Sequence, residues 1–412
     1  MRCRLATLSA AAALLLAGCS DGAAPPTGAP ATDSLRARAL AAGLAPLPER
    51  PPFYPTDNPG SPEKTELGHL LFFDPILSGA RDAACSTCHL PRLAFADGRQ
   101  FPLGSGAVGL GPERTTADPL RPRPMPRNSP TVFNVGVHGS GSPEPTQNGM
   151  MFWGGGAFGL EAQVLNPIAA DNELRGESFP KAVAIDSVVA RLRGIPEYVD
   201  RFRAAFPDEA AAARGDVARL VTFLTLRRAL AAYLRELVTP QAPLDRFLRG
   251  DAAALDAEQK AGLALFIGKA RCVACHRGPE LSDFAVHVIG VRQDGIGRDS
   301  TPGDDLGHGE NGDRPHTFRT APLHQVAETA PYFHDGVAAT LEDVVRFKNR
   351  GASEHPRVGD AELDPAVRPL GLTDQEVKEL VAFLRALSDT ITVRGPLFQA
   401  PAGVPSGLEV PK

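Results

Sequence analysis

The sequence predicts an all-α fold of two helical domains with long loops. The chain has 412 residues, which exceeds one small hydrophobic core and suits two domains of ordinary size. A C-x-x-C-H motif occurs once in each half, at residues 85–89 and 272–276. Apolar residues recur with helical spacing between Gly- and Pro-rich segments. The clearest helices are expected at 186–206, 217–238, 258–267 and 373–387.

The repeated motif is the attachment signature of a c-type haem. Its two thiols add to the vinyl groups of one porphyrin, and the histidine that follows binds the iron. On a helical turn, positions i, i+3 and i+4 share a face, so all three side chains reach one macrocycle. The sequence therefore predicts two covalently bound haems. Their attachment residues are Cys85, Cys88, His89, Cys272, Cys275 and His276.

A zinc half-site or a thioredoxin-like dithiol is the alternative for a single C-x-x-C copy. The two pairs of a zinc ribbon lie about 15–20 residues apart, whereas these two pairs lie in opposite halves of the chain. The histidine directly after each second cysteine also favours haem.

The first 18 residues have the pattern of a secretory signal peptide. Arg2 and Arg4 precede an apolar run that is too short to cross a bilayer and ends Leu-Ala-Gly-Cys at Cys19. This ending resembles the bacterial lipobox, which implies cleavage before Cys19 and a lipid on its thiol. Ordinary cleavage near Ala17 is the alternative. Because haem c is attached outside the cytoplasm, we expect a protein on the periplasmic side, lipid-anchored to the cell envelope.

Charge and cysteine usage exclude some classes of protein. The formal net charge is −5, and loss of Arg2 and Arg4 with the leader makes it −7. An acidic chain without a basic run is not expected to bind nucleic acid. Two of the six cysteines lie in the leader region and four in the motifs, which leaves none for a disulfide.

The mature chain is expected to have four parts. Residues 19–52 are rich in Ala, Pro, Gly and Thr and are expected to form a flexible tether, with one short helix at 34–42. The first haem domain is expected at 53–238 and the second at 239–395. A Pro-rich tail follows at 396–412.

Further short motifs follow the first C-x-x-C-H in a fixed order. They are Arg-Asn-Ser-Pro-Thr at 127–131, Phe-Trp-Gly at 152–154, Gln-x-x-x-Pro-Ile at 163–168, and Glu173. This order resembles the bacterial di-haem cytochrome c peroxidase family, which includes the MauG-like branch. The resemblance covers roughly residues 63–389. It implies two cytochrome c-like helical domains, each wrapped around one haem.

The resemblance implies roles for residues of the first domain. His89 would be the proximal ligand of the peroxide-reacting haem, and Gln163, Pro167 and Glu173 would line its distal side. Glu173 would be the acid/base that moves a proton between the peroxide oxygens. Trp153 would lie between the haems and help to carry electrons. Without the resemblance, a lone Trp indicates core packing and a lone Glu a solvated surface.

A calcium site between the haems is also implied. The run at 328–336 matches the C-terminal signature of the family. There, the carbonyls of Thr329 and Pro331 and the side chain of Asn128 would supply the oxygen ligands that calcium demands. A purely structural turn is the alternative.

The sequence departs from the family pattern at both irons. Many members have a histidine before the Arg-Asn pair that caps the resting first iron, but no histidine lies between Leu90 and Arg127. We therefore expect an open site, with Met125 as the alternative cap. Lys348 stands where peroxidases have Met and the MauG-like branch has Tyr. A buried, neutral lysine amine can bind ferric haem, and an exposed lysine is the alternative.

The resemblance implies an oxidoreductase that reduces hydrogen peroxide to water. Electrons would come from a small cytochrome c or a cupredoxin near the second haem. One alternative is MauG-like, peroxide-dependent oxidation of a protein or organic substrate. Another is a non-catalytic di-haem electron-transfer cytochrome, against which stand Glu173 and the expected open iron. The sequence leaves a homodimer open.

Overall fold

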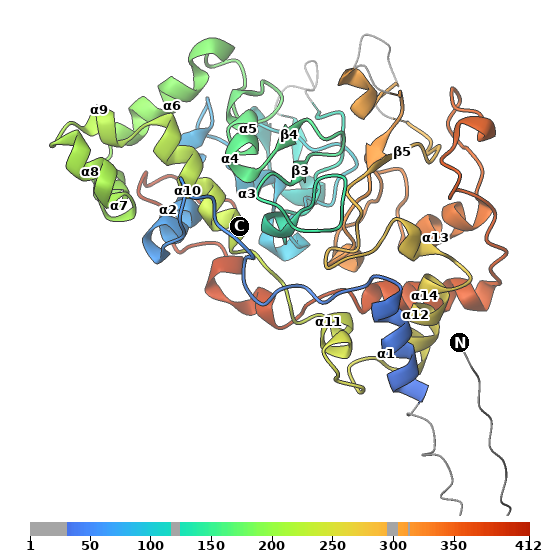
Figure 1. The fold of residues 1–412 in the computed structure, drawn as a ribbon. Coiled ribbons are helices and arrows are strands. Elements are labelled where there is room, and N and C mark those ends of the chain that lie inside the picture. The colour runs from blue at the N-terminus through green and yellow to red at the C-terminus, as the bar shows by residue number, and fades with distance from the viewer. Residues whose placement is uncertain (1–30, 117–123, 295–303, 312–313) are drawn as a thin grey trace, which may run out of the picture.

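The structure is a computed structural model that describes residues 31–116, 124–294, 304–311 and 314–412 (Figure 1). The expected signal peptide and Cys19 lie outside the described residues. The helices are α1 (Ala31–Ala41), α2 (Pro62–Phe73), α3 (Cys85–Cys88), α4 (Leu160–Gln163), α5 (Asn166–Ala169), α6 (Ala184–Arg193), α7 (Pro196–Ala205), α8 (Pro207–Ala213), α9 (Val217–Leu220), α10 (Phe223–Arg235), α11 (Pro243–Leu248), α12 (Ala257–Ile267), α13 (Leu341–Arg350) and α14 (Asp374–Arg385).

Helices dominate, but the part of the chain that the structure describes also has three short β-ribbons that the sequence did not predict. Each ribbon pairs two antiparallel strands of two residues. The strands are β1 (Ala107–Val108) with β2 (Thr115–Thr116), β3 (Met150–Met151) with β4 (Ala157–Phe158), and β5 (Val286–His287) with β6 (Phe318–Arg319). Such short strands lack the alternation of apolar and polar residues that makes a longer strand predictable.

Two predicted helices are each divided in the structure. The segment 186–206 forms α6 and α7, because Pro196 has no N–H to continue α6 and instead begins α7. The segment 217–238 forms α9 and α10, since the side chain of Thr222 accepts a hydrogen bond from Thr225 N and caps α10. The helices predicted at 258–267 and 373–387 are confirmed as α12 and α14, capped by Asp256 and Thr373.

Two crossing helix pairs give the halves a similar framework. Helix α2 packs on α10, and α12 packs on α14. In each pair, the two helix backbones approach most closely at a glycine. A Cβ added to Gly68 would lie 2.0 Å from Ala229 O, and one added to Gly262 would lie 2.0 Å from Glu379 O. Only glycine therefore permits these backbones to approach so closely.

The buried apolar residues form two main clusters. In Figure 1, α2 and α6–α10 gather at one end of the molecule, and α1 and α11–α14 at the other. One cluster contains residues from 67–237 and the other contains residues from 244–387. Apart from Leu35, Ala39 and Leu44 in the second cluster and Phe398, Val404 and Val410 in the first, the clusters lie on either side of the expected domain boundary after residue 238, which remains a prediction.

Residues 31–52 are not the flexible tether that the composition predicted. Leu35, Ala39 and Leu44 are buried in the second cluster. Gly278 N donates to Gly43 O at 2.8 Å, which joins this segment to the second half. The prediction from composition was wrong because α1 and the following turn bury only three apolar side chains in this cluster, and these are widely spaced in the sequence.

The Pro-rich C-terminal segment also packs on the protein. Phe398, Val404 and Val410 belong to the first cluster, although they follow the second half in sequence. The hydroxyl of Ser406 donates to Asp74 Oδ1 at 2.6 Å, and that of Tyr233 donates to Leu397 O at 2.9 Å. The last residues therefore cover the first half of the molecule.

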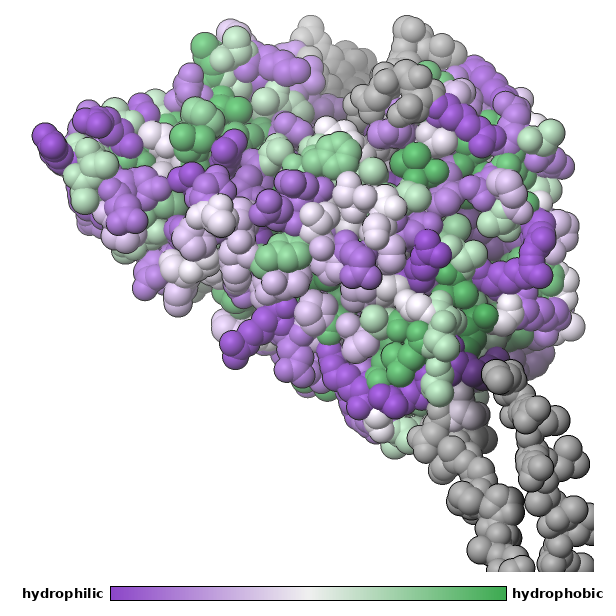
Figure 2. All heavy atoms as spheres, in the orientation of Figure 1, coloured by the Kyte–Doolittle hydropathy of each residue, from purple (hydrophilic) through white to green (hydrophobic). Residues whose placement is uncertain are grey.

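The face of the molecule in Figure 2 has polar residues interspersed with small apolar groups. Among the described residues, no helix has both the length and the apolar character needed to cross a membrane.

Candidate functional site

One cavity of about 990 Å³ reaches both C-x-x-C-H motifs. It gathers the predicted site residues of both halves, apart from Cys85, which packs against the first apolar cluster, and Cys19, which lies outside the described residues. The predicted residues that line it are Cys88, His89, Asn128, Trp153, Gln163, Pro167, Glu173, Cys272, Cys275, His276, Thr329, Pro331 and Lys348. Met125, the alternative cap of the first iron, also lines it.

Each motif forms one turn of helix, as its spacing predicts. His89 N donates to Cys85 O at 3.1 Å, and His276 N donates to Cys272 O at 2.8 Å. The four motif cysteines are free thiols. Each turn therefore presents two thiols and an imidazole from one short segment, which is the arrangement that covalent haem attachment requires.

The two motif histidines are held in the tautomer that can bind iron. His89 Nδ1 donates to Phe95 O at 3.0 Å, and His276 Nδ1 donates to Leu281 O at 2.8 Å. Because Nδ1 carries the ring proton, Nε2 keeps its lone pair. Burial lowers the pKa of both imidazoles, that of His276 to about 4, so both are neutral at physiological pH.

Three predicted distal residues lie together on the cavity wall of the first half. Gln163 ends α4, Pro167 lies in α5, and Glu173 follows in the next turn. Burial and, to a smaller extent, the Glu173 carboxylate raise the pKa of the Cys85 thiol to about 12. Glu173 is therefore near enough to the first motif to act on its charges.

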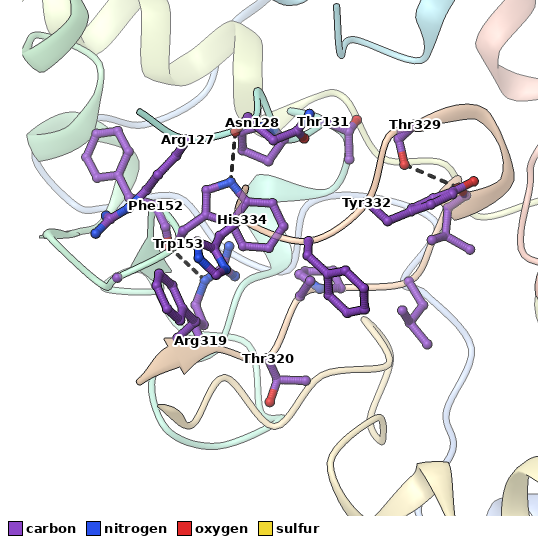
Figure 3. Close-up of a pocket in the computed structure, with 18 of the residues that line it drawn as sticks. Arg127, Asn128, Thr131, Phe152, Trp153, Arg319, Thr320, Thr329, Tyr332 and His334 are labelled. Carbon is purple, nitrogen blue, oxygen red and sulfur yellow. Dashed lines mark hydrogen bonds between the residues drawn. The ribbon is translucent and has the colours of Figure 1, made fainter. Parts of the chain in front are cut away.

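Trp153 is held between the segments that carry Asn128 and Arg319 (Figure 3). Its indole Nε1 donates to Asn128 O, and its own main-chain oxygen accepts from Arg319 N at 2.9 Å. The residue after Asn128 is Ser129, whose hydroxyl donates to Cys88 O at 2.7 Å. This contact joins the Trp153 segment to the first motif.

The connection to the second motif runs through Thr320. Its hydroxyl donates to Asp283 Oδ1 at 2.7 Å, and Asp283 N donates to Cys275 O at 2.8 Å. Since Thr320 follows Arg319, the neighbour of Trp153, short hydrogen-bonded paths connect Trp153 to both motifs.

Lys348 faces the second motif from α13. Its Nζ lies 6.0 Å from the centre of the Phe333 ring and 5.6 Å from that of Phe347. Burial lowers the pKa of Lys348. Burial also raises the pKa of the Cys272 thiol to about 12 and lowers that of His276 to about 4, and the Lys348 charge opposes the first shift and adds to the second. The side chain therefore lies inside the cavity, close to the expected iron ligand.

The residues expected to bind calcium lie on the same cavity wall. Asn128 Nδ2 donates to Arg99 O at 2.7 Å, which leaves Asn128 Oδ1 as the acceptor end of the amide. Thr329 and Pro331 lie on a loop of the second half that lines the same cavity. The structure thus brings the three residues to one cavity from two distant parts of the sequence.

The structure adds two buried ionisable residues that the sequence analysis did not select. Arg319 is 6% exposed, donates from Nε to Phe152 O at 3.0 Å, and has no partner for Nη1 among the described residues. Glu280 is 1% exposed and has no partner for either carboxyl oxygen among them. Burial raises its pKa. No pattern in the sequence marks them, since each is a single residue of a loop or a short strand.

These features fit two covalent haems. The cavity joins both motifs, the thiols are free, each histidine offers Nε2, and buried polar groups of the wall lack partners. In the bound state, the iron of each haem would supply the redox chemistry. The four cysteines and the two histidines would hold the haems.

Comparisons with known proteins agree with the site. A family described as "Di-haem cytochrome c peroxidase" matches residues 62–253. The chain is 35% identical over 346 residues to the methylamine utilization protein MauG of Methylorubrum extorquens, covering 82% of each chain. It is 35% identical over 333 residues to the cytochrome c551 peroxidase of Pseudomonas aeruginosa, covering 80% of each.

Solved structures show the same fold. A MauG-like protein associated with microbial copper homeostasis matches with a TM-score of 0.69 and 30% identity, covering 86% of this chain and 98% of that one. The di-haem peroxidase BthA of Burkholderia thailandensis matches with a TM-score of 0.58 and 22% identity, covering 84% and 96%, and supports the fold alone. The chain therefore belongs to the di-haem cytochrome c peroxidase family, a family of oxidoreductases.

Proposed function

We propose that this enzyme reduces hydrogen peroxide to water with electrons from a small redox protein, either a cytochrome c or a cupredoxin. Each turnover adds two electrons and two protons to one peroxide and gives two waters. The observation that carries the proposal is that one cavity holds His89 together with Gln163, Pro167 and Glu173. A haem at the first motif would supply the redox iron, and the other three residues would surround the peroxide.

Glu173 is the proposed acid/base. Its carboxyl group would take a proton from one peroxide oxygen and give it to the other, so that the leaving oxygen departs as water. A positioned carboxyl group typically contributes about 10²–10⁴-fold to such a step. Gln163 would orient the peroxide through its amide, and Pro167 would keep the wall beside it rigid and apolar.

Electrons would enter near the second haem and reach the first by way of Trp153. Lys348 and His276 would be the protein ligands of the second haem iron. The first iron is proposed to be open at rest, with Met125 as the alternative cap. A calcium ion at Asn128, Thr329 and Pro331 would connect the two halves of the molecule near Trp153.

The proposed location is the periplasmic side of the cell envelope, with a lipid on Cys19. This follows from the leader pattern, and haem attachment outside the cytoplasm agrees with it. We also propose that the chain divides into haem domains at residues 53–238 and 239–395. A homodimer is a further proposal.

MauG-like oxidation of a protein or organic substrate is the second candidate. Lys348 favours it, because the residue replaces the Met that peroxidases place on the second iron. A Met ligand raises a haem's reduction potential, and its absence would weaken the second haem as a store of electrons. The 35% identity to a MauG protein is consistent with this candidate.

The test is peroxide turnover by the holoprotein with either a pre-reduced cytochrome c or a reduced cupredoxin. The expected result is peroxide-dependent oxidation of two donor molecules for each peroxide consumed, with the haem-free protein as control. Oxidation of neither donor would contradict the peroxidase proposal. If peroxide is consumed only when an oxidisable protein or organic substrate is present, the MauG-like candidate replaces it.

A further inference from the structure

Three metal-binding side chains converge outside the haem cavity. Asp304, His316 and His355 each direct one ligand atom to a common point, and these atoms lie within 4.8 Å of one another. His316 Nε2 lies 2.9 Å from Asp304 Oδ1, and His355 Nε2 lies 3.8 Å from the same oxygen. The two imidazole centres are 4.5 Å apart. These separations are about those between neighbouring ligands of one small ion.

His355 supplies an independent indication that this cluster takes a ligand. Its side chain is only 2% exposed, and its Nε2 has no hydrogen-bond partner among the described residues. A buried polar nitrogen without a partner is costly, and native structures seldom leave one unsatisfied. A bound ion at the point where Nε2 faces Asp304 Oδ1 would satisfy it.

Arg357 orients the carboxylate and leaves one oxygen for an ion. Its Nη1 lies 2.7 Å from Asp304 Oδ2, so Oδ1 remains directed at the two imidazoles. The main-chain nitrogen of Arg357 donates to His355 Nδ1 at 3.1 Å, so without an ion the ring proton sits on Nε2. An ion on Nε2 would move this proton to Nδ1 and so break the hydrogen bond from Arg357 N. That bond joins two residues only two positions apart in the sequence.

We propose that Asp304, His316 and His355 form a site for a divalent first-row transition metal, best matched by zinc. Two imidazoles and one carboxylate are a usual ligand set for Zn²⁺, with water completing the tetrahedron. Calcium and magnesium prefer oxygen ligands and fit the site poorly. The site is separate from both haem irons and from the expected calcium, because none of its three ligands lines the haem cavity.

The second cluster of similar composition carries no such proposal. Cys275, Asp283 and His287 also lie close together. The Cys275 thiol is needed for haem attachment, so it is not free to bind a separate metal ion.

The role of the proposed ion is structural. Asp304 precedes Asp305, which holds Arg127 through two hydrogen bonds of 2.6 and 2.5 Å. Arg127 in turn precedes Asn128, the hydrogen-bond acceptor of Trp153. An ion at Asp304 would join the loops that carry His316 and His355 and so support the Asp305–Arg127 pair beside the Trp153 segment.

The test uses the full-length holoprotein, treated with a chelator and then returned to calcium-containing buffer. Zinc chloride is titrated by calorimetry, and metals are counted by mass spectrometry with the two haem irons as the internal standard. We expect one zinc ion per chain and a higher unfolding temperature, because binding to the native state stabilises it. A His316→Gln/His355→Gln double variant should bind zinc more than about 100-fold more weakly, since even outer-shell partners are worth about 10–100-fold.

His308→Gln is the matched control, because His308 lies on the same loop outside the cluster. It should bind zinc like the wild type. Equal binding by the double variant would overturn the proposal. If the double variant fails to retain its haems, the wild-type titration decides, and failure of the wild type to take up zinc overturns the proposal by itself.

Discussion

Trp153 Nε1 donates a hydrogen bond to the main-chain oxygen of Asn128 at 2.8 Å. This bond orients the indole toward the segment that carries Ser129 and contacts the first motif. On its main-chain side, Trp153 is joined to Arg319 of the second half. Trp153 is thus attached to both halves of the molecule, at the position where we propose that an electron crosses.

Replacement of Trp153 by Phe tests this position. The variant keeps an aromatic ring but loses the Nε1 donor, so we expect a stability loss of about 0.5–1.5 kcal/mol. Both haems should be retained. Stopped-flow absorbance should show an unchanged first reaction with peroxide but slower transfer of electrons from the second haem. Transfer at the wild-type rate would mean that Trp153 only packs between the halves.

Replacement of Glu173 by Gln tests the proposed proton transfer. The amide keeps the size of the side chain but cannot accept and release the proton. Peroxide turnover should fall by about 10²–10⁴-fold with both haem spectra preserved. Glu177→Gln is the control, because Glu177 is exposed four residues later and does not line the cavity. Similar turnover in the two variants would exclude Glu173 as the acid/base.

The haem motifs could be predicted from the sequence because their chemistry is local. Cys85, Cys88 and His89 lie within five residues, and one helical turn brings them together. The grouping of Trp153, Asn128 and Thr329 could not be derived from local pattern. It came from the resemblance to a family, since Thr329 belongs to the second half and lines the same cavity only when the two halves pack.

Other parts of the site had no signal in the sequence. Arg319 and Glu280 are single ionisable residues in a two-residue strand and a loop, where no periodicity separates buried from exposed positions. Arg319 donates a hydrogen bond to Phe152 O of the first half, so its position depends on how the two halves pack. The composition of residues 31–52 likewise predicted a flexible segment. The segment is nevertheless packed, because a few buried apolar side chains are enough to hold it in place.

Replacement of Gly262 by Ala tests the repeated helix crossing. An added Cβ would lie 2.0 Å from Glu379 O, so α12 and α14 must separate. Overpacking of this kind costs typically about 1–3 kcal/mol, and chemical denaturation of the holoprotein should show such a loss. At the control position, Gly403, an added Cβ meets no described atom within 4 Å, so Gly403→Ala should change stability by less than about 0.5 kcal/mol. Equal effects would contradict the close crossing.

His287 gives stability a predictable dependence on pH. The Asp283 carboxylate beside Nε2 raises the pKa of His287, and the Cys275 sulfur and the Asp364 carboxylate at Nδ1 act in the same direction. Because the folded pKa lies above the unfolded value, the contribution is complete below about pH 6.5 and is lost as the pH rises toward the folded pKa. The unfolding temperature of His287→Gln should therefore fall furthest below that of the wild type near pH 6. The difference should shrink at pH 9–10, and a constant difference would mean that His287 is neutral.

Replacement of Lys348 by Met tests the expected ligand of the second iron. A lysine amine has a free pKa of about 10.4 and must lose its proton to bind a metal. Burial in the cavity beside the second motif lowers the pKa of Lys348, which favours the neutral form. An amine is a harder donor than a thioether, so it should stabilise the ferric state, whereas Met ligation raises the reduction potential. In the Met variant, we expect a higher potential for the second haem and loss of the nitrogen-ligand signature in near-infrared and electron paramagnetic resonance spectra.

Lys378→Met is the control for this substitution, because Lys378 is exposed on α14. It should leave the spectra and the potential of both haems unchanged. If Lys348→Met behaves in the same way, another residue binds the second iron, and the buried amine only adds positive charge beside Cys272 and His276. A higher potential in the Lys348 variant alone would instead establish the lysine as the group that keeps the second haem oxidised. Donor-driven peroxide turnover of that variant should then rise, because a more easily reduced second haem takes up electrons from the donor more readily.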